Sequence, residues 1–106
     1  MKISEHEIRS NINDIYLTML FYYPNQTRSA LVNTLCQVLA IKEEDIKSTV
    51  SAACVLAGME LMDNGYVKLE YTHPVYPQIA LLSLTDKGMD YYQNNEHPFE
   101  ELFLLN

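Results

Sequence analysis

The hydrophobic pattern at the start of the chain predicts a helix. Apolar residues recur at steps of three and four positions from Ile8 to Tyr23, which is the spacing of one buried helical stripe. Ser4 and Glu7 stand three positions apart, as in a capping box, so the helix is expected to begin just after Ser4. Pro24 ends it, because a proline ring disfavours helical geometry at the preceding residue. We therefore expect one continuous helix up to Tyr23.

Two further helical patterns follow. Thr27 is the expected N-cap of a second helix, whose apolar face comprises Leu31, Leu35, Val38 and Leu39. A third helix is expected from about Glu43 to Met62, with acidic residues in its first turn, where the helix dipole favours negative charge. Its apolar side comprises Ile46, Val50, Ala53, Cys54, Ala57 and Leu61. Asp63-Asn64-Gly65 ends it, since these residues tolerate the left-handed conformation of a C-cap.

The period changes from helical to alternating after Gly65. Residues 66–72 alternate between apolar and polar, and residues 78–84 form a second apolar run. Pro74 and Pro77 lie between the two runs, so they exclude helix there and mark the tip of a β-hairpin. Thr85 is the expected cap of a fourth helix over about residues 86–94. The pattern predicts an α+β, mainly α fold, with three helices, a β-hairpin and a C-terminal helix.

Three motifs in this order resemble those of winged-helix regulators of the MarR and PadR kind. Ser48-Thr49-Val50-Ser51 is similar to a stretch of their recognition helix, Asn64-Gly65-Tyr66-Val67 to the step into the wing, and Leu84-Thr85-Asp86-Lys87-Gly88 to the signature after the wing. The resemblance covers about residues 4–94. It implies a winged-helix domain over residues 1–96, followed by an apolar tail at residues 97–106. In that family the start of the recognition helix contacts base edges in the major groove, so the resemblance implies DNA binding.

The charge of the chain argues against that implication. Seven Lys and Arg face fourteen Asp and Glu, for a net charge of -7, and the basic residues are scattered singly. Nucleic-acid-binding domains usually carry a basic footprint. Glu43, Glu44 and Asp45 at the start of the third helix would be held against phosphates. The candidate DNA contacts that remain are Arg28, Ser29, Lys47, Ser48, Ser51 and Lys68.

Tyrosines and the apolar tail are the candidate contacts for a protein partner. The chain has eight tyrosines, and the plainer interpretation places them at the edge of the core. Because Tyr is enriched in interface cores, we single out Tyr71, Tyr76, Tyr91 and Tyr92. In the tail, Phe99, Leu102 and Phe103 share a helical face and would be a liability in water. The tail therefore packs on its own core or docks on another subunit, and the first helix and the tail are the expected dimer contact.

Residue patterns typical of enzymes, metal sites and cofactor sites are missing from the sequence. His6, His73 and His97 lie far apart without metal-ligand spacing, so we expect them at the surface or in turns. Cys36 and Cys54 lie in helical patterns and are expected to be small core residues in a reducing cytoplasm. The sequence contains no nucleophile elbow and no phosphate-binding glycine loop. No apolar run approaches the length of a membrane span.

These observations lead to one expected function and two alternatives. We expect a small, acidic, non-enzymatic regulatory protein of the cytoplasm, with no cofactor and no membrane contact. It would act mainly through protein–protein contacts, as a homodimer. The first alternative is a sequence-specific DNA-binding transcriptional regulator of the MarR or PadR kind. The second is an acidic protein that mimics nucleic acid, as some phage-encoded proteins do.

Overall fold

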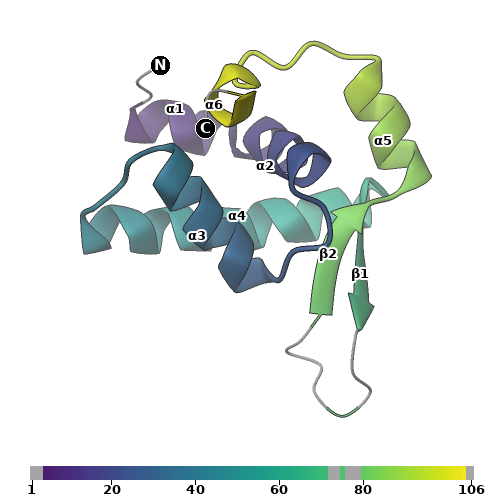
Figure 1. Cartoon of the computed structure of the whole chain (residues 1–106), viewed down its shortest axis with the longest axis horizontal. Coiled ribbons are helices and arrows are strands. Elements are labelled where there is room, and N and C mark those ends of the chain that lie inside the picture. Colours follow the sequence, from purple (N-terminus) through teal and green to yellow (C-terminus); the bar gives the residue numbers. More distant parts are fainter. Residues whose placement is uncertain (1–3, 72–74, 76–79, 105–106) are drawn as a thin grey trace.

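The chain is mainly helical and carries one small antiparallel sheet, as the sequence pattern predicts. The computed structural model describes residues 4–71, 75 and 80–104. Along them the elements are α1 (Glu5–Ser10), α2 (Ile12–Tyr22), α3 (Arg28–Val38), α4 (Glu44–Asp63), β1 (Val67–Tyr71), β2 (Ala80–Leu84), α5 (Asp86–Gln93) and α6 (Glu101–Leu104). Figure 1 shows α4 running the width of the molecule, with α1 and α2 on one side of it and the hairpin projecting from the other.

The prediction of one continuous helix before Pro24 is wrong, because the helix breaks at Asn11. The backbone of Asn11 leaves helical geometry (φ -120°, ψ 21°), and this residue ends α1 and precedes α2. Its side-chain amide donates to the carbonyl of Glu7 at 2.9 Å. Asn side chains that bond nearby backbone groups compete with the helix in this way. The predicted start is confirmed, since Ser4 and Glu7 form a complete capping box.

The second and third predicted helices are confirmed as α3 and α4. Thr27 caps α3, because its hydroxyl accepts a hydrogen bond from the Ala30 N–H at 3.1 Å. The predicted bounds of α4 are met within one residue at each end. Gly65 follows its C-cap with φ of +79°, a left-handed conformation that glycine adopts without steric cost. The chain can therefore reverse sharply from α4 into β1.

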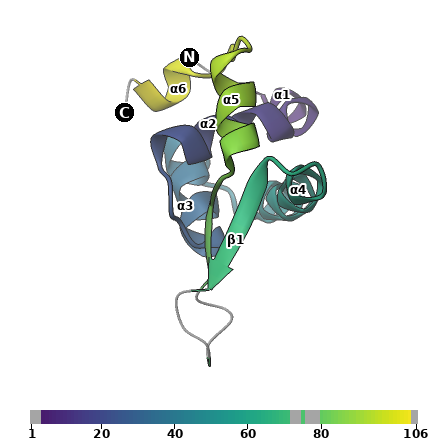
Figure 2. The ribbon, with the colours of Figure 1, turned by 90° about the vertical axis from the view of Figure 1, so that its right-hand side faces the viewer.

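The centre of the core is α2. It packs against α4, β2, α5 and α6, and Figure 2 shows it enclosed between these elements. Six consecutive residues from Ile15 to Leu20 are buried on this helix, which explains why its apolar pattern is broader than a single stripe. From the other elements the core takes up, among others, Ile8, Leu31, Leu35, Val50, Cys54, Ala57, Leu61, Val67 and Leu82.

The hairpin is joined to the helices at two places. In its register Val67 lies opposite Leu84 and Leu69 opposite Leu82. The segment before α3 adds a bridge, because Gln26 and Leu82 exchange backbone hydrogen bonds of 2.7 and 3.3 Å. Thr85 joins the other end, since its hydroxyl accepts from the Gly88 N–H and donates to the Gly65 carbonyl at 2.5 Å. Pro74 and Pro77, which mark the predicted tip, lie outside the described residues.

The C-terminal segment packs on its own chain. Phe99, Leu102 and Phe103 are buried in the same core as α2, and α6 lies against α2. Of the two alternatives that the sequence leaves open for residues 97–104, the structure shows the intramolecular one. Figures 1 and 2 both place α1 and α6 on the side of the molecule opposite the hairpin.

Candidate functional site

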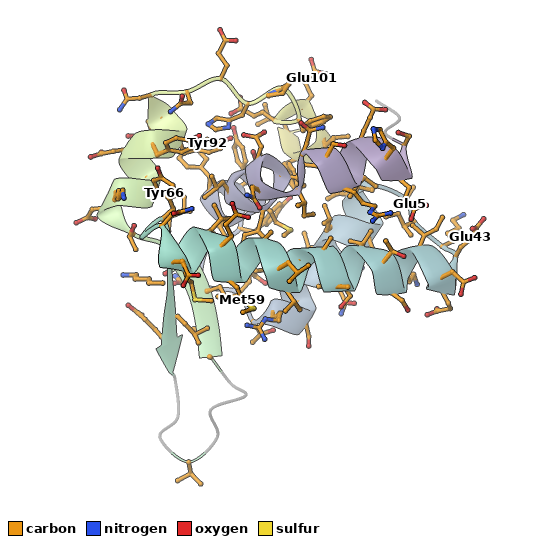
Figure 3. All side chains as sticks on the ribbon, turned by 180° about the vertical axis from the view of Figure 1, so that it is seen from behind. Glu5, Glu43, Met59, Tyr66, Tyr92 and Glu101 are labelled. Atoms are coloured by element: carbon orange, nitrogen blue, oxygen red, sulfur yellow. The ribbon has the colours of Figure 1, made fainter. Side chains whose placement is uncertain are left out.

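One side of α4 is exposed along much of its length, and we call it the outer stripe (Ser48, Ala52, Leu56 and Met59). These residues follow at steps of four, four and three, so they share one side of the helix. Leu56 is 67% exposed and Met59 is 53% exposed. Figure 3 shows Met59 on the edge of α4 that faces away from α1 and α2. The opposite side of α4 is buried through Val50, Cys54, Ala57 and Leu61.

Acidic residues lie at both ends of the outer stripe. Glu43, Glu44 and Asp45 are exposed at the N-terminal end of α4, and Glu60 and Asp63 are exposed near its C-terminal end. Figure 3 shows Glu43 and Met59 well apart along the helix. The outer stripe thus presents a small and apolar centre between two negatively charged ends. The sequence pattern missed Leu56 and Met59, although their position off the buried stripe of α4 was the available signal.

The six candidate DNA contacts lie in three places. Arg28 and Ser29 are exposed at the start of α3, two and three residues beyond the Gln26 bridge to β2. Lys68 lies opposite Ser83 in the hairpin, and its ammonium pairs with Glu70 at 3.1 Å. The remaining three residues lie on the N-terminal half of α4: Lys47, Ser48 and Ser51. The ammonium of Lys47 lies 3.7 Å from the Glu44 carboxylate, so an acidic neighbour offsets its charge.

Most of the candidate partner contacts are not available as a surface. Tyr92 is buried, and so are the tail residues Phe99, Leu102 and Phe103. The expected dimer contact through the tail needs these side chains exposed, whereas the core of the same chain already holds them. Tyr91 is 41% exposed. Tyr71 lies in β1, but its side chain and all of Tyr76 fall outside the described residues.

Of the two places expected for His97, the turn is confirmed and the surface is not, because the residue lies between α5 and α6, its carbonyl accepts from the Glu100 N–H, and its side chain is buried. Its side chain is 4% exposed. Nδ1 lies 2.5 Å from the Asp14 carboxylate, and Nε2 lies 2.7 Å from the Tyr92 carbonyl oxygen. The imidazole also stacks on the Tyr92 ring with 3.7 Å between centroids, and Phe21 stacks on that tyrosine too. His97 thus joins the segment before α6 to α2 and α5.

The Tyr92 hydroxyl completes this cluster. It donates a hydrogen bond of 2.9 Å to the Glu100 carboxylate. Burial raises the pKa of the Tyr92 phenol, and the nearby carboxylate adds to the effect. Burial is also the main reason that the pKa of Tyr22 is raised. The cluster therefore holds neutral phenols against one carboxylate and stabilises the packing of the tail.

A pocket of about 350 Å³ lies where α2, the C-terminal end of α4 and α5 meet. Its lining comprises the polar Ser10, Asn13, Asp14 and Asn64, the apolar Leu17 and Leu61, and the aromatic Tyr66 and Tyr91. The rings of Tyr66 and Tyr91 lie close together, with 4.7 Å between centroids and an angle of 33° between their planes. A second pocket, of about 380 Å³, borders His97, Tyr92 and Glu100. The contact between Asp14 and His97 therefore links a residue of one pocket to a residue of the other.

The cysteines and acidic residues offer little reactive chemistry in this arrangement. Cys36 and Cys54 are free and buried. Burial raises the pKa of the Cys54 thiol to about 12 and raises that of Cys36 as well, so little thiolate forms near neutral pH. Within the described residues, no three His, Cys, Asp or Glu side chains lie together as a metal site. No described helix is long and apolar enough to span a membrane.

We compared the chain with protein-family models, with curated proteins and with solved structures, and none of the three comparisons finds a match.

Proposed function

We propose that this chain is a winged-helix regulatory protein that acts by binding another protein through the outer stripe of α4. The element order supports the fold, with α3 and α4 as the helix-turn-helix pair and β1–β2 as the wing. Three residues of the resembling motifs support the same fold: Gly65 has a positive φ, Thr85 caps α5, and Gly88 packs closely on Tyr66. The proposed action is non-enzymatic, and two buried free thiols fit the reducing environment of the cytoplasm.

The exposure of Leu56 and Met59 is the observation that carries the proposal. In a winged-helix protein that binds DNA, this side of α4 would enter the major groove, where polar and basic side chains contact bases and phosphates. Here the same side presents two large apolar residues. Exposed apolar residues rimmed by polar ones mark protein-binding surfaces, and Met and aromatic residues are enriched in interface cores.

The charges indicate what the partner looks like. Acidic residues at both ends of the outer stripe favour a partner with an apolar centre and basic flanks, because like charges across an interface are costly. A second copy of the outer stripe would place acidic ends on acidic ends in either helix orientation. The proposed partner is therefore a different protein with basic residues around an apolar patch. Self-association, which the sequence leads us to expect, would need another face.

The test compares two double variants with the same change in composition and charge. Leu56→Glu/Met59→Glu alters the outer stripe, whereas Leu104→Glu/Met89→Glu alters exposed residues of α6 and α5. Tagged proteins are used to capture partners from the cells that encode the chain, at low and at high salt. We expect the first double variant to lose at least about tenfold of a specific partner, a difference of about 1.4 kcal/mol, and the second to keep it. Salt should weaken the capture.

Equal capture by both double variants would overturn the proposal. Sedimentation of the wild-type chain over a range of concentrations reports self-association separately. A dimer that survives Leu56→Glu/Met59→Glu would place any homodimer contact on another face.

DNA binding is the second candidate, because Arg28 and Ser29 are exposed beside the hairpin. A gel shift at low salt with the DNA upstream of its own gene tests it. If this candidate holds, Arg28→Ala should weaken binding and flatten its salt dependence. If micromolar protein does not shift the DNA in the gel, DNA binding is ruled out as the function.

A further inference from the structure

We propose that the pocket between α2, α4 and α5 binds a small flat organic cation, such as an aromatic amidine or guanidine. Its volume of about 350 Å³ lies at the lower end of the range for small-molecule sites. The proposal concerns ligand binding alone, so it stands or falls independently of the protein partner of α4.

An unpaired carboxylate oxygen is the first observation. The Asp14 carboxylate has one oxygen, Oδ1, on the imidazole of His97. The other oxygen, Oδ2, is buried, and no hydrogen-bond donor among the described residues reaches it. A buried acceptor without a donor is unfavourable, because it has lost its bonds to water. Asp14 lines this pocket, so a small rotation of its carboxylate toward the pocket would bring this oxygen within reach of a ligand N–H group and complete its bonding with a charge-assisted hydrogen bond.

The aromatic walls are the second observation. Tyr66 and Tyr91 lie with their rings 4.7 Å apart at one side of the pocket, and Tyr91 is 41% exposed. The Lys87 ammonium already sits 4.9 Å from the centroid of the Tyr66 ring. Because Lys87 and Tyr91 already cover the Tyr66 ring, the face open to a ligand cation is that of the partly exposed Tyr91, and an aromatic face attracts positive charge through its quadrupole. Figure 3 shows Tyr66 at the C-terminal end of α4, below α5.

The remaining lining residues fit the same ligand. Leu17 and Leu61 provide an apolar contact for a flat ring, while Asn13 and Asn64 provide amide oxygens for further N–H groups. The net charge of -7 favours a cation over an anion. An amidinium group on an aromatic ring meets all of these requirements in one small molecule.

The experiment uses benzamidine as the probe and follows backbone amide signals of the labelled chain by NMR. We expect saturable shifts at residues 10–14, 64–66 and 91. Benzamide has nearly the same shape without the charge, and benzoate carries the opposite charge. Both should bind at least about tenfold more weakly, the factor that corresponds to losing about one charge-assisted hydrogen bond.

Variants separate the pocket from nonspecific binding. Tyr91→Ala should weaken benzamidine at least fivefold, whereas Met89→Ala, which changes an exposed residue of the same helix outside the pocket, should not. Asp14→Asn should also weaken it, and its amide oxygen can still accept from His97. Should Asp14→Asn fail to fold, the Tyr91 variant and the comparison of benzamidine with benzamide still show whether this pocket binds the cation. Equal binding of benzamide and benzamidine, or no effect of Tyr91→Ala, would overturn the proposal.

Discussion

His97 and Asp14 meet at 2.5 Å although 83 residues separate them along the chain. The contact joins the segment before α6 to the start of α2, and the Tyr92 carbonyl holds the other side of the ring. Local sequence spacing gives no sign of such a pair, because its partners come from opposite ends of the chain.

Removing the His97 side chain should release the tail. We expect His97→Ala to lower the free energy of unfolding by about 2 kcal/mol, since it leaves Asp14 partly buried without its partner and removes a stacked ring. Urea unfolding measures the loss, and hydrogen exchange should rise at residues 99–104. His6→Ala is the matched control, because His6 is exposed. Similar stability of the two variants would show that the His97 contact contributes little.

Gly88 should not tolerate a larger side chain. A Cβ atom at this position would lie 2.0 Å from the backbone carbonyl oxygen of Tyr66, so α5 would have to move away from the end of α4. We expect Gly88→Ala to lower the free energy of unfolding by about 3 kcal/mol. Chemical denaturation checks this, with Met89→Ala as the control. An unchanged denaturation midpoint for Gly88→Ala would contradict the close packing.

The cap of α5 should matter more than the cap of α3. The Thr85 hydroxyl accepts from the Gly88 N–H and also donates to the Gly65 carbonyl, whereas only a cap hydrogen bond is described for the Thr27 hydroxyl. We expect Thr27→Ala to lower the free energy of unfolding by about 1 kcal/mol and Thr85→Ala by about 2 kcal/mol. Thr49→Ala serves as the control, since its hydroxyl bonds only within α4. The reverse order of the two caps in urea unfolding would argue against this account.

Stability should fall in strongly alkaline solution. Burial raises the pKa of Tyr16 from 10.0 to about 12, and that of Cys54 from 9.0 to about 12. Both groups are neutral when protonated, so the folded state retains protons that the unfolded state loses first. The stabilisation is complete below about pH 9 and declines as the pH rises toward 12. Urea midpoints across this range measure the decline.

Two variants identify the groups responsible. Tyr16→Phe and Cys54→Ala should each reduce the slope of the unfolding free energy against pH. The reduction should correspond to about one proton for each variant. A wild-type midpoint that stays constant from pH 9 to pH 11 would show that neither group is perturbed by burial.

The sequence predicts the parts of the fold that depend on local signals. Thr27 and Thr85 indicate where α3 and α5 begin, and Gly65 indicates the turn from α4 into the hairpin. These features act within a few residues, so they are visible in the pattern. Asn11 is also a local signal, for the break between α1 and α2, since its side chain bonds the backbone four residues earlier.

The rest depends on contacts that are distant in sequence. The position of Phe99 and Phe103 could not be decided, because an apolar face has the same pattern whether it covers its own core or a partner. The burial of His97 follows from its pairing with Asp14, which only the folded chain brings together. Leu56 and Met59 differ from these residues, because their spacing in the sequence already places them off the buried side of α4.

The position of α1 and α6 has a practical consequence for binding experiments on this chain. Both helices lie on the side opposite the hairpin (Figures 1 and 2), and Met59 faces away from α1 (Figure 3). An affinity tag or a surface linker that continues the chain beyond α1 or beyond α6 therefore leaves the described residues on the side away from the outer stripe. Immobilised in either way, the protein should present α4 and the hairpin to the solution in the same orientation.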